Sequence, residues 1–151
     1  MSFRFKRDKE KWDEKWLNTE EGFFSELWNN IKKRCSPEYM KKNKPNRKVK
    51  VNNGIRDKYH LLEMWESQKK LLGGPYCIYT GVKLTTVRHR GKGFTGYTKT
   101  NISIDRIDPN LPYQEDNIVF CSWEFNDTKG SVSPSDCELI LKVYKENHAR
   151  N

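Results

Sequence analysis

The chain has 151 residues, of which 34% are hydrophobic and 32% charged, and its net charge at pH 7 is +9. This length allows one domain, or one small core with a helical extension, and the lack of any run of about 18 apolar residues predicts that no segment spans a membrane. The first residues lack the apolar core of a signal peptide, so we expect a cytoplasmic protein that is not secreted.

The excess of positive charge suits a polyanionic partner, because Lys and Arg side chains that neutralise phosphates release condensed counterions. We therefore expect nucleic acid as the partner, DNA in the first place with RNA as the alternative; a solvated basic surface is the competing interpretation. The cysteines at 35, 77, 121 and 137 match no disulfide module, which favours a reducing compartment and small buried side chains.

Residues 1–74 are predicted to form a helical region with a basic connector. Thr19 has the residue type of an N-cap, and apolar side chains recur at helical spacing from there to Arg34. A further helix is expected to begin near Asp57 and to end at Gly73, the first residue of a Gly-Gly-Pro sequence.

The connector between these helices, residues 35–56, contains two prolines and an Asn-Asn-Gly sequence. These residues predict an exposed, irregular segment, with room for one short strand at 49–51. Its basic side chains are predicted to contact nucleic acid, foremost Lys41, Lys42 and Lys44.

A second basic segment, residues 84–100, interleaves cations with Phe94 and Tyr97. Such a segment can follow a phosphate backbone while its rings contact sugar or base. A flexible loop with solvated charges is the equal alternative. The predicted contacts are Arg88, Arg90 and Lys92.

Residues 101–130 have the pattern of strand, turn, strand and helix. Alternating isoleucines lead into Asp105, an Asp-Pro-Asn turn follows, and a β-branched and aromatic run precedes a polar stretch that suits a helix. This order can aim two oxygen ligands at one divalent cation, and Asp105 is the first choice, because hard cations such as Mg²⁺ prefer carboxylate oxygen. A last amphipathic helix is expected at 137–144.

The same residues resemble the ββα-metal core of HNH endonucleases, in the form that bacteriophages often encode. The family pattern is Asp-His at the end of the first strand, a central Asn that opens the second, and His or Asn on the helix with Lys three residues later. Here these positions hold Asp105-Arg106, Asn117, and Asn126 with Lys129. The approach at 75–85 is also similar, so the resemblance covers about the C-terminal half, residues 75–151.

The resemblance implies an α+β protein with N-terminal helices, an HNH-like ββα-metal core and a C-terminal helix. It implies a DNA endonuclease that hydrolyses phosphodiester bonds through one Mg²⁺ or Mn²⁺ ion, held by Asp105 and Asn126. Asn117 would hold the loop between the strands, and Lys129 would contact a phosphate. If a bacteriophage encodes the protein, it would act in the host cytoplasm.

Arg106 departs from the family pattern at the position of the general base. A guanidinium carries only hydrogen-bond donors and stays protonated at neutral pH, so Arg106 cannot take a proton from water. We expect it to bind the scissile phosphate, with an ion pair to a neighbouring carboxylate as the alternative. His89 is the leading substitute base, and activation of the water by the metal ion alone is the alternative.

Structural zinc is not expected, because many relatives bind it with two Cys-x-x-Cys pairs, and Cys77 and Cys121 alone cannot make a closed four-ligand site. Two further function classes stay open. One is a nucleic-acid-binding protein with a decayed catalytic site, for which Arg106 is the best evidence. The other is a basic scaffold protein of a phage or replication assembly. The pairing of Asp105 with Asn126 favours the enzyme, since a binding protein needs neither.

Overall fold

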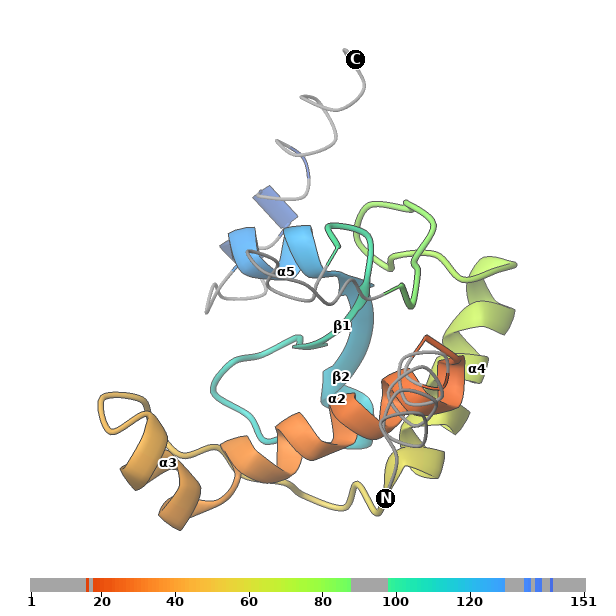
Figure 1. Cartoon of the computed structure of the whole chain (residues 1–151). Helices are drawn as coiled ribbons and strands as arrows, with labels where there is room; N and C mark the ends of the chain where they lie inside the picture. The colour runs from red at the N-terminus through yellow and green to blue at the C-terminus, as the bar shows by residue number, and fades with distance from the viewer. Residues whose placement is uncertain are drawn as a thin grey trace, which may run out of the picture.

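The computed structural model describes residues 16, 18–87 and 98–129, together with residues 135, 136, 138, 139 and 142. In this part of the chain the fold is α+β, as predicted, with four α-helices and a two-stranded antiparallel sheet (Figure 1). The elements are α2 (Glu20–Arg34), α3 (Pro37–Asn43), α4 (Lys58–Leu72), β1 (Ile102–Arg106), β2 (Ile118–Ser122) and α5 (Trp123–Lys129). Most of the C-terminal helix predicted at 137–144 lies outside the described residues. No described helix is long and apolar enough to cross a membrane.

Helices α2 and α4 begin and end where the sequence predicted. Thr19 caps α2 by accepting a hydrogen bond from the N–H of Gly22, and Asp57 caps α4 through the N–H of His60. Helix α4 ends at Gly73, whose φ of 78° lies in the left-handed region that glycine adopts without a steric penalty.

An aromatic cluster joins α2, α4 and β2 into one core. The ring of Phe120 lies 5.5 Å from that of Phe24 and 5.4 Å from that of Trp65, and all three side chains are buried. Gln68 of α4 donates a hydrogen bond to the Phe120 carbonyl at 2.8 Å and accepts one from its N–H at 3.0 Å. The backbone N–H and carbonyl groups of Phe120, on the free edge of β2, therefore both have a hydrogen-bond partner.

The register of the sheet decides which side chains reach the candidate site. Ile104 lies opposite Phe120, and Asp105 lies opposite Val119. Because successive side chains of a strand point to opposite faces, Ile104 and Arg106 share the face that packs on the aromatic cluster, whereas Asp105 points away from it. Helix α5 covers that second face, where its side chains bond those of β1.

The connector differs from the prediction. An irregular segment with a short strand at 49–51 was expected, but Pro37–Asn43 form helix α3. Ser36 caps α3 by accepting a hydrogen bond from the N–H of Tyr39 at 3.3 Å, and Pro37 takes the first turn, where a missing N–H costs nothing. In place of the predicted strand, the chain makes an isolated bridge between Asn52 and Tyr113.

Candidate functional site

The Asp105 carboxylate lies between β1 and α5 and is buried, with 4% of the residue exposed. Lys129, from the last turn of α5, is buried as well and places its Nζ 3.0 Å from Oδ1 and 2.9 Å from Oδ2 of this carboxylate. The same ammonium donates to the backbone carbonyl of Arg106 at 3.2 Å. The attraction and these hydrogen bonds offset the desolvation of both charges. The predicted metal ligand therefore already has a positively charged partner.

Tyr79 is a third member of this group. Its hydroxyl donates a hydrogen bond to Oδ2 of Asp105 at 2.6 Å. Its ring stacks on that of Phe125 from α5, with the centroids 4.8 Å apart, and lies 5.9 Å from the Nζ of Lys129. Both oxygens of the carboxylate are thus held by donors of the protein.

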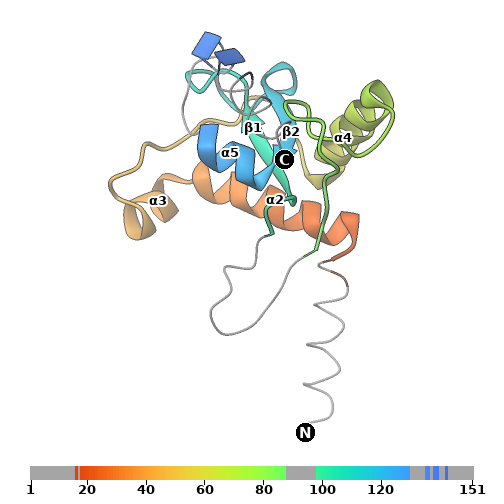
Figure 2. The same ribbon diagram turned by 90° about the horizontal axis from the view of Figure 1, so that it is seen from above.

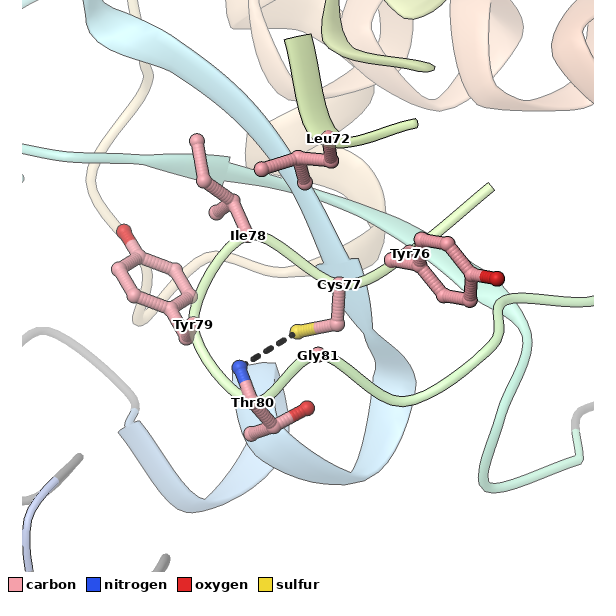
Figure 3. Close-up of a pocket in the computed structure, with 7 residues that line it drawn as sticks. All are labelled: Leu72, Tyr76, Cys77, Ile78, Tyr79, Thr80 and Gly81. Carbon is pink, nitrogen blue, oxygen red and sulfur yellow. Dashed lines mark hydrogen bonds between the residues drawn. The ribbon is translucent and has the colours of Figure 1, made fainter. Parts of the chain in front are cut away.

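The loop that carries Tyr79 turns around Cys77 (Figure 3). The Cys77 sulfur accepts a hydrogen bond from the N–H of Thr80 at 3.4 Å, and Gly81 has a φ of 75°. The hollow at this loop is lined by no charged side chain, so we assign no chemistry to it. Cys77 and Cys121 are both fully buried, in agreement with the prediction of small buried side chains, whereas Cys35 is only partly buried and Cys137 lies outside the described residues. Among the described residues, no group of three or more His, Cys, Asp or Glu could hold a metal ion; the lack of structural zinc stays a prediction.

Asn126 lies one turn before Lys129 on the same face of α5. Its Nδ2 donates to Oγ of Ser103 at 2.6 Å and to the carbonyl oxygen of Ile104 at 3.1 Å. Because Ser103 and Asp105 lie two residues apart on the face of β1 that α5 covers, the two predicted metal ligands belong to one interface. With the amide nitrogen engaged on β1, Oδ1 is the atom of Asn126 that remains to meet a cation.

Asn117 holds the loop between β1 and β2 closed. Its buried Oδ1 accepts a hydrogen bond from the N–H of Asp108 at 2.9 Å. Its Nδ2 donates to the carbonyl oxygens of Asp108 at 3.1 Å, Pro112 at 3.0 Å and Leu111 at 3.4 Å. This is the arrangement that the predicted loop-holding role requires.

Arg106 leaves β1 on the opposite face from Asp105. Its Nη1 donates to the carbonyl oxygen of Leu111 at 3.0 Å, and its guanidinium carbon lies 5.2 Å from the ring centroid of Tyr113. Within the described residues Arg106 makes no ion pair with a carboxylate, which was the alternative role left open by the sequence. The structure therefore groups Arg106 with the loop and not with the side chains of Asp105 and Asn126.

The predicted nucleic-acid contacts fall into three groups. Lys41 and Lys42 lie in the last turn of α3 and Lys44 follows it; all three are exposed and accessible to a ligand. Lys129 has its ammonium buried against Asp105 and can reach a phosphate only by leaving that pair, so its phosphate contact stays a prediction. Outside the described residues lie Arg88, Arg90, Lys92 and the predicted base His89.

Two tyrosines at the site did not stand out in the sequence. Tyr79 and Tyr113 bond side chains that are 26 and 79 residues away along the chain, Asp105 and Arg34. A tyrosine hydroxyl needs a hydrogen-bond partner when the ring is buried, but no local pattern tells which partner the fold supplies.

Comparison with known proteins adds no assignment. No protein-family model, no curated protein and no solved structure matches the chain. The geometry of the site therefore carries the functional inference by itself.

Proposed function

We propose that the protein is a metal-dependent DNA endonuclease that hydrolyses phosphodiester bonds at a one-metal site of the HNH type, with Mg²⁺ or Mn²⁺ as the ion. The observation that carries the proposal is the convergence of Asp105 and Asn126 on the face of β1 that α5 covers. The strand, loop, strand and helix order and the loop-holding Asn117 support the same core. The net charge of +9 supports a nucleic-acid substrate.

The donor set suits a hard divalent cation, since it combines a carboxylate with an amide oxygen. The carboxylate now has a competing cation, because Lys129 holds both oxygens of Asp105 while Tyr79 donates to one of them. A metal ion at Asp105 therefore has to displace the ammonium of Lys129. The released ammonium would then carry a charge that a phosphate of the substrate can neutralise.

A divalent cation, when bound, polarises a phosphate oxygen and lowers the pKa of water. The chain supplies the rest of the site. Asp105 and Asn126 hold the ion, Tyr79 orients the carboxylate of Asp105, and Asn117 keeps the loop after β1 in shape. Arg106 contributes positive charge only, because a guanidinium has no acceptor for the proton of the attacking water.

Plasmid cleavage by the purified protein tests this proposal. Mg²⁺ or Mn²⁺ should support cleavage, EDTA should stop it, and both Asp105→Asn and Asn126→Ala should abolish it. Asn126→Ala matters because it leaves the pair of Asp105 and Lys129 intact, so that loss of cleavage is not a consequence of an unpaired buried charge. The matched control is Asp127→Asn, an exposed position on the same helix, which should cut like the parent. Parental cleavage by Asp105→Asn would exclude the metal assignment.

One observation favours a second candidate, a nucleic-acid-binding protein whose catalytic site has decayed. The pair of Lys129 and Asp105 is complete without a metal ion, as expected where a lysine has taken the place of the cation. Titration calorimetry with Mg²⁺ separates the two candidates. Binding heat that disappears in Asp105→Asn supports the enzyme, whereas a parent that binds DNA and shows no such heat supports the decayed site.

A further inference from the structure

Two arginine side chains from separate segments contact Tyr113, and a lysine of the connector is bonded through its backbone to one of these arginines. Arg34, at the end of α2, donates from Nη1 to the Tyr113 hydroxyl at 3.3 Å. Arg106, at the end of β1, lies over the same ring with its guanidinium carbon 5.2 Å from the centroid. Lys50 of the connector donates its backbone N–H to the carbonyl oxygen of Arg34 at 3.0 Å. These three residues are far apart in the sequence and are brought together by the fold.

Tyr113 is a fixed platform for this cluster. The residue is 2% exposed, its N–H donates to the carbonyl of Val51 at 2.9 Å, and its carbonyl accepts from the N–H of Asn53 at 2.7 Å. The loop between β1 and β2 is thereby held against the connector and the C-terminal part of α2 (Figures 1 and 2). Backbone hydrogen bonds thus fix the tyrosine ring against which Arg34 and Arg106 lie.

The cluster has no compensating carboxylate in the described part of the chain. The ion pairs found there involve none of Arg34, Lys50 and Arg106. Burial, together with the charges of Arg106, Arg34 and Arg47, lowers the pKa of Lys50 to about 8. An anion bound beside Arg34, Lys50 and Arg106 would relieve this repulsion, and groups with shifted pKa values cluster at functional sites.

We propose that Arg34, Lys50 and Arg106 form a phosphate-binding site at Tyr113 that holds a backbone phosphate of the nucleic acid. Guanidinium groups match the oxygens of a phosphate in pairs, and the ammonium adds a point charge with rotatable donors. Tyr113 keeps Arg34 and Arg106 on one surface. The choice of nucleic acid as the source of the phosphate rests on the proposed function, whereas the anion site itself rests on the cluster.

The site also changes the role of Arg106. Its side chain and that of Asp105 leave β1 on opposite faces, so the phosphate at Tyr113 is not the one that meets the candidate metal ligands. Arg106 therefore anchors the strand at a neighbouring phosphate, and the nucleic acid passes around the end of β1 between the two positions. Its contribution is to affinity and to the register of the substrate.

Binding of a fluorescein-labelled DNA duplex, measured by anisotropy in EDTA, tests the site without any cleavage. The double variant Arg34→Gln/Lys50→Gln should bind roughly tenfold or more weakly at a fixed salt concentration. The slope of log affinity against log salt should fall by about 1, as expected for one lost phosphate contact. A second double variant, Arg34→Lys/Lys50→Arg, keeps both charges and should retain the parental slope within about 0.3.

The control is Lys70→Gln/Lys83→Gln, which removes the same number of charges from exposed positions outside the cluster. It should leave the slope at the parental value and weaken binding by less than about threefold. Urea unfolding of all variants shows whether each is folded at the assay temperature. A poly-Glu peptide, labelled in the same way, serves as the second probe for an acidic protein segment.

The outcomes separate this site from the endonuclease proposal. If the glutamine variant binds DNA like the control variant, the phosphate site is overturned, and the endonuclease proposal stands because no cleavage was measured. If the parent never cuts DNA but the slope of log affinity against log salt falls as expected in the glutamine variant, the phosphate site stands and the endonuclease proposal fails. Tighter binding of poly-Glu than of DNA by the parent, or no binding of DNA, would overturn nucleic acid as the ligand.

Discussion

Lys129 directs its ammonium at both oxygens of the Asp105 carboxylate, at 3.0 and 2.9 Å, and neither side chain has more than 5% of its surface exposed. A monovalent cation of the protein itself therefore stands where the sequence predicts a metal ion. Any ion that binds Asp105 in the folded protein must compete with this ammonium, and the competition can be measured as stability.

Lys129→Met should lower the melting temperature in EDTA. Methionine fills a similar volume but leaves the Asp105 carboxylate buried without a counter-charge, which costs about 3–5 kcal/mol. Millimolar Mg²⁺ should then stabilise the variant more than the parent, because the ion no longer displaces an ammonium. Thermal unfolding of both proteins with and without Mg²⁺ measures the difference.

The control for this experiment is Lys58→Met, which removes a more exposed ion pair with Glu21 at 3.1 Å. It should cost about 1 kcal/mol or less and show no response to Mg²⁺ beyond that of the parent. An equal response of Lys129→Met and Lys58→Met to Mg²⁺ would show that Asp105 does not bind the ion.

Asn117→Ala should destabilise the protein by about 2–3 kcal/mol, because the N–H of Asp108 and several carbonyl oxygens of the loop lose their buried partner. Asn117→Asp should be no better, since it keeps the acceptor but turns a carboxylate toward those carbonyl oxygens. Urea unfolding measures both. Asn110→Ala, at an exposed position of the same loop, should change stability by less than about 0.5 kcal/mol. Similar stabilities of all three variants would contradict the loop-holding role.

Elements whose signals are local were predicted correctly. Thr19, Asp57 and Gly73 carry the capping chemistry of their helices in their own side chain or backbone. Alternating isoleucines mark the first strand, and a β-branched and aromatic run marks the second. Helix α3 was missed although Ser36 and Pro37 are a cap and a first-turn residue, because the surrounding charge and prolines favoured an irregular segment. Here the local capping signal outweighed composition.

The candidate site was predictable only in part. The sequence predicts Asp105 at the end of a strand, Asn117 at the start of the next strand and Asn126 on the following helix. The structure has Asp105 in β1, Asn117 at the end of a short 3-10 helix directly before β2, and Asn126 in α5. The contacts of Lys129 and Arg106, which change the chemistry of the site, instead join different elements of the fold. Whether Lys129 points at solvent or at a carboxylate, and whether Arg106 and Arg34 both reach Tyr113, depends on which faces of helix and strand pack together, and no local pattern encodes that.

Lys50 gives a prediction about pH. Its pKa is about 8 in the folded protein and near 10.4 in an unfolded chain, so between these values the unfolded state binds more protons. The free energy of unfolding should therefore rise as pH rises from about 8 to about 10, and the destabilising effect of the charge is fully present below pH 8. Lys50→Gln should stabilise the protein at pH 7 by about 1 kcal/mol, a value reduced because solvent screens this half-buried side chain.

Urea unfolding at pH 7 and pH 10 measures this effect. The difference in the free energy of unfolding between Lys50→Gln and the parent should be smaller at the higher pH, where Lys50 of the parent has lost its charge. Lys48→Gln, at an exposed neighbouring position, should change little at either pH. If Lys50→Gln raises the free energy of unfolding by the same amount at both pH values, the charge of Lys50 does not destabilise the folded protein.

Arg106 connects the two proposals, because it ends the strand that carries Asp105 while its guanidinium belongs to the cluster at Tyr113. If it holds a backbone phosphate equally in the ground state and the transition state, Arg106→Ala should raise KM and leave kcat within a few-fold of the parent. A clamp on the scissile phosphate would instead lower kcat by about 10²-fold or more. Steady-state and single-turnover cleavage kinetics distinguish these patterns.

A double-mutant cycle locates Arg106 even if cleavage is slow. If Arg106 and Arg34 bind the same phosphate, the losses of DNA affinity in Arg106→Ala and Arg34→Gln should be strongly non-additive in EDTA, because the first substitution already removes most of the contact. Arg56→Ala, which breaks an exposed pair with Glu63 at 3.8 Å, is the control and should add to Arg34→Gln without coupling. Additive losses for Arg106 and Arg34, together with a fall in kcat, would assign Arg106 to the scissile phosphate and remove it from the cluster at Tyr113.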